Sequence, residues 1–216
     1  MAMQLRIYVP PHPLVQHWLA MARDKNTPGI LFRTAMTELG RWLTYEAMRD
    51  WLPVIETMVE TPLGPAAATI VNPETPIAVV PVLRAGLTLL DGAQQVLPRA
   101  SVYHLGLARD EETLQPTCYL NKLPSSFAPG TRILISEPML ATGGSIMATM
   151  KELTDRQANP ELVRIISVVA APPALQQLGE HYPTLQIYTA TIDEGLNEQG
   201  FIVPGLGDAG DRAFET

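Results

Sequence analysis

Residues 133–145 have the sequence ILISEPMLATGGS, and this segment decides the fold class. The apolar start predicts a buried strand, Glu137 follows at its end, and the small residues 141–144 predict a tight turn that opens a helix. Backbone N–H groups in such a turn point toward one spot, and the helix N-terminus adds partial positive charge. The segment predicts a cradle for one phosphate group, although an ordinary strand-to-helix turn has the same composition. It lacks the lysine of a nucleoside triphosphatase loop, which disfavours ATP hydrolysis.

Outward from this segment, short apolar runs alternate with helical stretches. Strands are expected over 77–83, 102–107, 132–136, 163–171 and 185–192, and helices over 86–97, 144–157 and 173–181. Strands that are apolar on both faces are typical of a parallel sheet covered by helices on both sides. The sequence therefore predicts an α/β core over about 76–192.

Three further parts flank this core. Apolar residues at helical spacing predict N-terminal helices over about 13–52. Two strand-like runs joined by a Pro-Leu-Gly-Pro turn predict a projecting β-arm over about 54–75. A glycine-rich loop over about 193–216 completes the chain. Since no repeat or low-complexity segment interrupts it, one domain over 1–216 is the economical interpretation.

Composition excludes several classes of function. The 216 residues include 15 Lys and Arg against 22 Asp and Glu, a net charge of −7, which disfavours an electrostatic nucleic-acid binder. A single cysteine, Cys118, excludes a disulfide scaffold and a thiolate zinc site. No apolar run approaches the roughly 20 residues that cross a bilayer, and the first residues lack the pattern of a signal peptide. We therefore expect neither a nucleic-acid nor a membrane partner, and a cytoplasmic location.

Two arginines follow strands at the same predicted edge of the sheet. Arg84 stands with Ala85 and Gly86 between a strand and a helix, and Arg109 follows the next strand, where its acidic neighbours equally fit a solvated loop. A guanidinium beside small residues suits an anion, and open parallel sheets bind ligands beyond the carboxyl ends of their strands. Glu137 at this edge is placed to accept hydrogen bonds from vicinal hydroxyls, so the edge predicts a sugar-phosphate site.

The C-terminal loop contains a misleading motif. Residues 205–210 formally match G-x-G-x-x-G, but only six residues follow Gly210, too few for the βαβ unit of a dinucleotide-binding fold. A loop with three glycines and little side-chain bulk exposes its backbone donors and acceptors. We expect this loop to bind the edge of a planar base.

Together these segments resemble the uracil phosphoribosyltransferase family, of the type I phosphoribosyltransferase fold. The most specific motifs are PMLATGG at 138–144 and PGLGDAGD at 204–211, and HPLV at 12–15, LTYEA at 43–47 and DEETL at 110–114 extend the resemblance over nearly the whole chain. The resemblance implies a pyrimidine salvage enzyme that transfers the phosphoribosyl group of phosphoribosyl pyrophosphate to N1 of uracil, giving uridine monophosphate and pyrophosphate.

The resemblance also assigns residues to the two substrates. Catalytic roles fall on Asp208, Arg84 and Arg109, and uracil is assigned to Ile202, Gly207, Asp208 and Ala209. The residues assigned to phosphoribosyl pyrophosphate are Arg84, Ala85, Gly86, Arg109, Glu137, Pro138, Met139, Leu140, Ala141, Thr142, Gly143, Gly144, Ser145 and Asp208. The implied cofactor is Mg²⁺, held mainly by substrate oxygens without a direct protein ligand, with Asp208 reaching it through water. A non-proline cis peptide bond is implied immediately before Ala85.

Two positions depart from the family pattern, because Glu137 stands where relatives usually have Asp and Phe201 where they usually have Tyr. These departures motivate a second hypothesis, a catalytically weak nucleotide- or phosphoribosyl pyrophosphate-binding regulator of the same fold. A transferase for another base is a third. The resemblance further implies a homodimer or higher homo-oligomer and GTP as an activator, for which the sequence shows no site.

Overall fold

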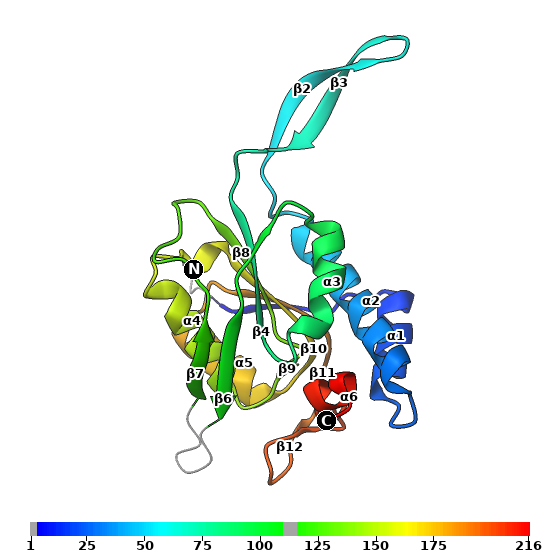
Figure 1. The fold of residues 1–216 in the computed structure, drawn as a ribbon, viewed down its shortest axis with the longest axis vertical. Coiled ribbons are helices and arrows are strands. Elements are labelled where there is room, and N and C mark those ends of the chain that lie inside the picture. The colour runs from blue at the N-terminus through cyan, green and yellow to red at the C-terminus, as the bar shows by residue number, and fades with distance from the viewer. Residues whose placement is uncertain (1–3, 110–115) are drawn as a thin grey trace.

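The computed structural model describes residues 4–109 and 116–216 (Figure 1). The first elements are β1 (Arg6–Tyr8), α1 (Pro13–Arg23), α2 (Gly29–Met48), β2 (Val54–Thr61) and β3 (Gly64–Val71). They are followed by β4 (Ile77–Leu83), α3 (Leu87–Val96), β5 (Ser101–Val102), β6 (Leu105–Arg109), β7 (Pro116–Asn121), β8 (Arg132–Ser136) and β9 (Met139–Leu140). The last are α4 (Gly144–Thr154), a 3₁₀ turn (Pro160–Leu162), β10 (Val163–Ala170), α5 (Pro172–His181), β11 (Gln186–Ile192), β12 (Gly195–Leu196), β13 (Ile202–Val203) and α6 (Ala209–Phe214).

The central sheet has the strand order β1-β11-β10-β8-β4-β6-β7. All neighbours along this path are parallel except β6 and β7, which pair antiparallel. The short strands β5 and β9 add to β4 and β10. The prediction of an α/β fold with a central, mostly parallel sheet flanked by helices is confirmed.

Two apolar cores lie on the two faces of this sheet because successive strand residues point to opposite sides. In β4, Val79 packs into the core that contains α1, α2, α3 and α6, whereas Ala78 and Val80 pack into the core that contains α4 and α5. Every residue of β10 is buried, as expected for a strand covered on both faces. No helix within the described ranges is long and apolar enough to span a bilayer.

Some predicted boundaries are wrong for identifiable reasons. The strand expected over 102–107 is interrupted: β5 pairs with the start of β4 and β6 with its end, and the chain between them leaves the ladder. The helix expected over 144–157 ends at Thr154, and Gln157 has a φ of +65°, a left-handed conformation that an α-helix of L-residues does not contain. Residues 193–216 are not all loop, because they include the β12–β13 hairpin and α6.

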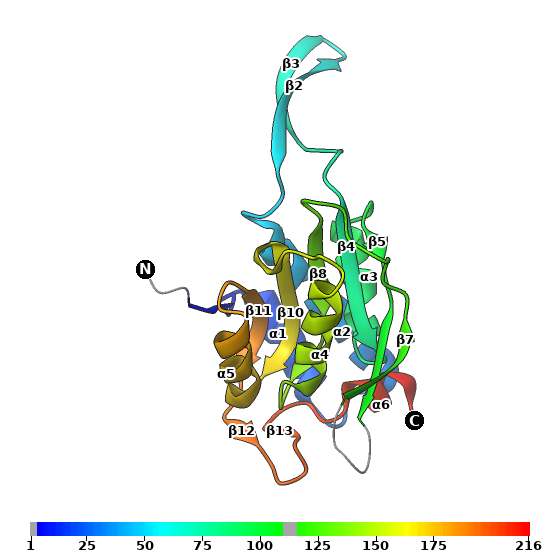
Figure 2. The ribbon, with the colours of Figure 1, turned by 90° about the vertical axis from the view of Figure 1, so that its left-hand side faces the viewer.

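The strands β2 and β3 form a hairpin that projects from the body of the protein (Figures 1 and 2). The two strands are antiparallel neighbours from the pair Val54 and Val71 to the pair Thr61 and Gly64. Apolar side chains remain exposed along it, including Met58, 61% exposed, and Leu63 at the turn. This hairpin is the β-arm that the sequence predicts.

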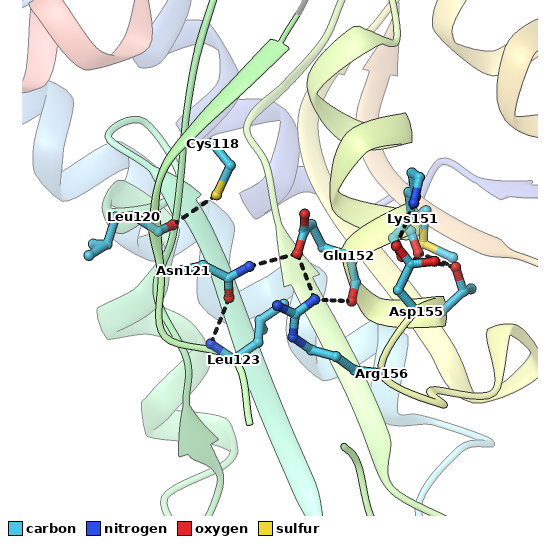
Figure 3. A network of polar contacts seen from close by, with 10 residues as sticks. Cys118, Leu120, Asn121, Leu123, Lys151, Glu152, Asp155 and Arg156 are labelled. Carbon is cyan, nitrogen blue, oxygen red and sulfur yellow. Dashed lines mark hydrogen bonds and ion pairs between the residues drawn. The ribbon is translucent and has the colours of Figure 1, made fainter. Parts of the chain in front are cut away.

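A polar network joins β7 to α4, the helix that follows the turn at residues 141–144 (Figure 3). The Asn121 amide donates to the Glu152 carboxylate over 2.6 Å, and the Arg156 guanidinium donates to the same oxygen over 2.6 Å. The Asn121 oxygen accepts from the backbone N–H of Leu123, which fixes the amide orientation. The network therefore ties the outermost strand of the sheet to the helix that begins at the turn.

Candidate active site

Three adjoining cavities lie at the carboxyl ends of the parallel strands, the end of the sheet opposite the β-arm (Figure 1). We call them the loop cavity, about 310 Å³, beside residues 199–208; the edge cavity, about 170 Å³, beside 82–85; and the turn cavity, about 60 Å³, within 139–146. Glu137, Met139 and Ser145 border all three. A ligand with three arms meeting at one ring fits this arrangement.

The turn cavity is formed where β9 gives way to α4. Gly143 is the N-cap of α4 with a φ of +96°, a left-handed conformation that glycine adopts without steric cost. A side chain there would also approach the Gln177 amide oxygen within 2.8 Å. The first N–H groups of a helix have no acceptor within the helix, and at the start of α4 the Gly144 N–H makes only a long hydrogen bond, 3.5 Å, to the Thr142 hydroxyl, so this helix start suits an anion. The predicted phosphate cradle thus has the expected local structure.

The edge cavity lies where β4 turns into α3. Gly86 fits there only because it lacks a side chain: a Cβ would lie 2.5 and 2.6 Å from the backbone N and O of Val82 and against the carbonyl of Ser136. Arg84 and Ala85 border the cavity. The non-proline cis peptide bond lies between Leu83 and Arg84, so the expectation of such a bond immediately before Ala85 is wrong by one residue.

The Arg84 guanidinium already has a partner in this structure. It forms an ion pair of 2.8 Å with Asp211 in α6 and a 3.4 Å hydrogen bond to the Thr216 hydroxyl. Both charged side chains are about half exposed, 53% and 52%. An exposed pair of this kind contributes little to stability and separates readily, so Arg84 remains available to an anionic ligand.

The loop cavity is shaped by the C-terminal segment. Ile202, Gly207 and Asp208 border it, as do Gln199, Gly200 and Phe201. The Asn197 side-chain oxygen accepts from the backbone N–H groups of Gln199 and Phe201, at 3.1 and 2.9 Å, and holds this turn. Asn197 was not among the residues singled out from the sequence, although asparagine commonly starts a turn by accepting from the backbone N–H two residues on.

Not every residue assigned from the sequence borders a cavity. Gly86, Pro138 and Ala209 line none of the three: the Pro138 carbonyl accepts from Val168 and Val169, and Ala209 is fully buried. Arg109 ends β6, and residues 110–115, with the whole DEETL motif, lie outside the described residues. The sequence search in turn missed Pro116, Val169 and Leu206 of the loop cavity and Leu107 of the edge cavity.

Asp208 stands between the loop and edge cavities and borders both. It is the N-cap of α6, and its Oδ1 accepts from the backbone N–H of Asp211 over 2.9 Å. Mg²⁺ typically keeps several waters and binds through one or two carboxylates plus substrate phosphates. The Asp208 and Glu137 carboxylates both border the edge cavity, and Asp208 is the residue that would help to hold an ion of that kind there, together with substrate oxygens.

Glu137 is buried at the junction of the cavities, with 7% of its surface exposed. Burial raises the pKa of its carboxyl to about 8, and the backbone N–H of Met139 opposes the shift. In the ligand-free protein Glu137 is therefore mostly protonated at neutral pH. Hydrogen bonds donated by two hydroxyl groups of a ligand favour the ionised carboxylate and oppose the effect of burial.

We expect this carboxyl to make stability fall with rising pH. Between the ordinary pKa of 4.5 and the folded value of about 8, the folded state holds a proton that the unfolded chain has lost, so the contribution is complete below pH 4.5 and lost as the pH rises through 8. Glu137→Gln removes the titrating group. The free energy of unfolding of this variant, compared with that of wild type, should therefore be a few kcal/mol more favourable at pH 9 than at pH 5, since one pKa unit equals about 1.4 kcal/mol. Urea denaturation at the two pH values measures the difference, and parallel pH profiles for both proteins would contradict it.

A larger cavity, about 680 Å³, lies elsewhere, near the attachment of the β-arm and the start of β4. Its lining includes Pro73, Pro76, Pro98 and Pro124, and it lies at the amino ends of the strands. Parallel sheets place their ligands at the opposite end, where helix N-termini and strand ends converge. We therefore take the three smaller cavities as the candidate active site.

Comparisons with known proteins place the chain in one family. A family model described as uracil phosphoribosyltransferase matches residues 9–216. A uracil phosphoribosyltransferase of Nostoc sp. is 69% identical over all 216 residues of both chains, and one of Nicotiana tabacum is 50% identical over 99% of this chain and 95% of its own. A solved structure of a protein from Aquifex aeolicus has a TM-score of 0.87 and 39% identity, over 96% of this chain and 97% of its own. The chain belongs to the uracil phosphoribosyltransferase family.

Proposed function

We propose that the protein transfers the phosphoribosyl group of phosphoribosyl pyrophosphate to N1 of uracil, forming uridine monophosphate and pyrophosphate. The observation that carries the proposal is the meeting of three cavities at Glu137, Met139 and Ser145. The ribose would lie at this junction, its 5′-phosphate in the turn cavity, the pyrophosphate in the edge cavity and uracil in the loop cavity. The family membership of the chain supports the same reaction.

The residues around the junction suit both halves of the displacement. The bond from ribose C1 to the pyrophosphate oxygen breaks, and Arg84 and Arg109 would favour departure of this anion. Mg²⁺, held mainly by substrate oxygens, would supply further positive charge to the pyrophosphate. The Asp208 carboxylate would stabilise positive charge that develops on the ribose, while uracil N1 forms the new bond and loses its proton. Holding both reactants in line contributes up to roughly 7–11 kcal/mol.

The backbone of the loop would read the base. Ile202 and Gly207 border the loop cavity, Gly207 without a side chain to cover its backbone, and Ala209 begins α6 next to Asp208. Backbone N–H and C=O groups match the alternating donors and acceptors of the uracil edge. Phe201, 47% exposed at the rim, offers an apolar ring where relatives usually have a phenol.

A turnover assay with the purified protein tests the proposal. With uracil, phosphoribosyl pyrophosphate and Mg²⁺, we expect uridine monophosphate and pyrophosphate to appear in equal amounts, and cytosine, adenine and hypoxanthine to react far more slowly. Binding of uridine monophosphate without any turnover would contradict the proposal and favour a regulator. Faster reaction with another base would contradict the assignment of uracil.

We also propose that the protein is a homodimer or higher homo-oligomer that uses the β-arm. An isolated two-stranded hairpin is at best marginally stable in water, and here Ile55, Val59 and Ile70 share one face of the arm without a charged neighbour on that face. A second copy of the chain would cover this face. The single cysteine, Cys118, is exposed and forms no disulfide, which suits the reducing cytoplasm that we propose as the location of the protein. Activation by GTP stays a prediction.

Val59→Lys is expected to convert the oligomer to a monomer, because the new charge would be buried against the partner without a counter-ion. Glu60→Lys, its neighbour on the opposite face of the arm, is the matched control and should keep the oligomer. Sedimentation velocity measures the mass of each species. A wild-type monomer at all concentrations, or an unchanged oligomer in Val59→Lys, would show that this face is not the interface.

A further inference from the structure

Two arginines hold the backbone of the base-binding loop from the side of the N-terminal helices. Arg23, the last residue of α1, pairs with the buried Asp193 and donates to the Gly205 carbonyl over 3.1 Å. The second carboxylate oxygen of Asp193 accepts from the Gly205 N–H over 2.9 Å. Both backbone groups of Gly205 are thus occupied by one ion pair.

The second arginine acts one residue further along. Arg212 donates to the Leu206 carbonyl over 2.7 Å, and also to the carbonyls of Ala22 and Asp24 at the end of α1. Its guanidinium lies 4.2 Å from the centre of the Phe32 ring. Arg212 therefore joins three carbonyl groups of two separate segments.

These contacts set the direction of the next peptide group. In a planar trans peptide the C=O and the following N–H point in opposite directions. Because the Leu206 carbonyl faces Arg212, the N–H of Gly207 faces away from Arg212, and Gly207 borders the loop cavity. Gly205 and Gly207, with φ values of +60° and +77°, permit this course of the chain.

A role in general stability accounts poorly for the arrangement. A buried ion pair such as Arg23 and Asp193 is costly to desolvate and adds little net stability, whereas it specifies one geometry. Arg23 and Arg212 donate to two consecutive carbonyl groups of the loop, those of Gly205 and Leu206, and Leu206 borders the loop cavity; the other contacts of Arg212 tie this loop to the end of α1. Gly205 and Gly207 have no side chains, so between Pro204 and Asp208 only the buried Leu206 side chain anchors the loop besides these backbone contacts.

We propose that Arg23, Asp193 and Arg212 are positioning residues for the base, which orient the Gly205–Gly207 backbone so that the Gly207 N–H meets uracil. The proposal rests on the function proposed above. None of the three borders the loop, edge or turn cavity, so each acts through the backbone of the loop. The α1 helix thereby becomes part of the base site although it does not line it.

Arg212→Met and Arg23→Met test this role, since methionine keeps much of the apolar stem and removes every donor. The KM for uracil should rise about tenfold or more, the loss expected for one misplaced hydrogen bond, while the KM for phosphoribosyl pyrophosphate changes less than about twofold. Arg212→Lys retains one charged donor for the Leu206 carbonyl and should restore part of the uracil KM. Arg33→Met is the matched control, because Arg33 donates to the Ala213 carbonyl at the far end of α6 and leaves the loop contacts intact.

Hydrogen exchange separates this inference from the proposed function. In the ligand-free protein, amides of residues 205–208 should exchange faster in Arg212→Met and Arg23→Met than in wild type or Arg33→Met. Unchanged exchange, a parallel rise of both KM values, or an equal effect of Arg33→Met would overturn the inference. If wild type does not turn over uracil, the proposed function fails, and exchange still decides whether the arginines order the loop. Should Arg212→Met not fold, Arg212→Lys and Arg23→Met give the same comparison.

Discussion

Asp208→Asn is expected to lower kcat about a hundredfold or more, comparable to the loss of one preorganised electrostatic group in other active sites. Asp208 borders both the loop and the edge cavity, so in the proposed reaction its charge would lie between the entering base and the departing pyrophosphate. Asparagine keeps the side-chain oxygen that accepts from the Asp211 N–H and is an equally good N-cap, so α6 should persist. The substitution therefore removes a charge and little else.

Steady-state kinetics and thermal unfolding together measure this effect. The melting temperature should stay close to that of wild type while kcat falls. Asp155→Asn is a suitable control, because Asp155 is an exposed carboxylate that pairs with Lys151 at the end of α4. Near-normal kcat in a well-folded Asp208→Asn protein would show that the carboxylate does not act on the reacting atoms.

Gly86→Ala is expected to have the second large effect, on activity and stability together. The three nearest atoms to the added Cβ would all be backbone atoms, the N and O of Val82 and the carbonyl oxygen of Ser136. Because the backbone of a central sheet is held by its hydrogen bonds, displacing it costs much free energy. Overpacking of this kind destabilises by about 1–3 kcal/mol, and relief requires moving Arg84 and Ala85 away from the edge cavity. We therefore expect a lower melting temperature and a loss of kcat/KM for phosphoribosyl pyrophosphate.

Gly179→Ala provides the comparison for this prediction. Gly179 lies within α5, where a Cβ would meet Leu5 at 3.7 Å, an ordinary contact. Alanine there should raise stability by up to about 1 kcal/mol through its higher helix propensity and leave kinetics unchanged. Equal behaviour of the two variants would contradict the close packing inferred at Gly86.

The parts of the fold that could be predicted are those with a local signal. The strands over 77–83 and 132–136 are continuous apolar runs, and the structure places β4 and β8 at the same residues. The end of α4 was missed, because the positive φ of Gln157 leaves no mark in the apolar pattern. The strand pair β6–β7 was only half predicted, since the polar sequence of β7 lies at the edge of the sheet, where apolar residues are not required.

The candidate site divides in the same way. Arg84, Glu137 and Asp208 follow strands or open helices, and the parallel topology brings such positions to one edge. Contacts between distant segments had no sequence signal: Arg84 and Asp211 are 127 residues apart, and Arg212 and Ala22 are 190 apart. The burial of Glu137 was likewise invisible, because it depends on how three segments close over one side chain.

In the proposed reaction, the ion pair between Arg84 and Asp211 would make an arriving pyrophosphate group replace an internal anion at Arg84. The free energy of pyrophosphate binding would then be reduced by the loss of the Arg84–Asp211 ion pair, and this ion pair would form again when the product leaves. Asp211 follows Asp208 by three residues. The start of α6 would therefore carry both Asp211, which competes with pyrophosphate for Arg84, and Asp208, which borders the proposed uracil site. In the proposed reaction, α6 would therefore limit the affinity for pyrophosphate and favour its release.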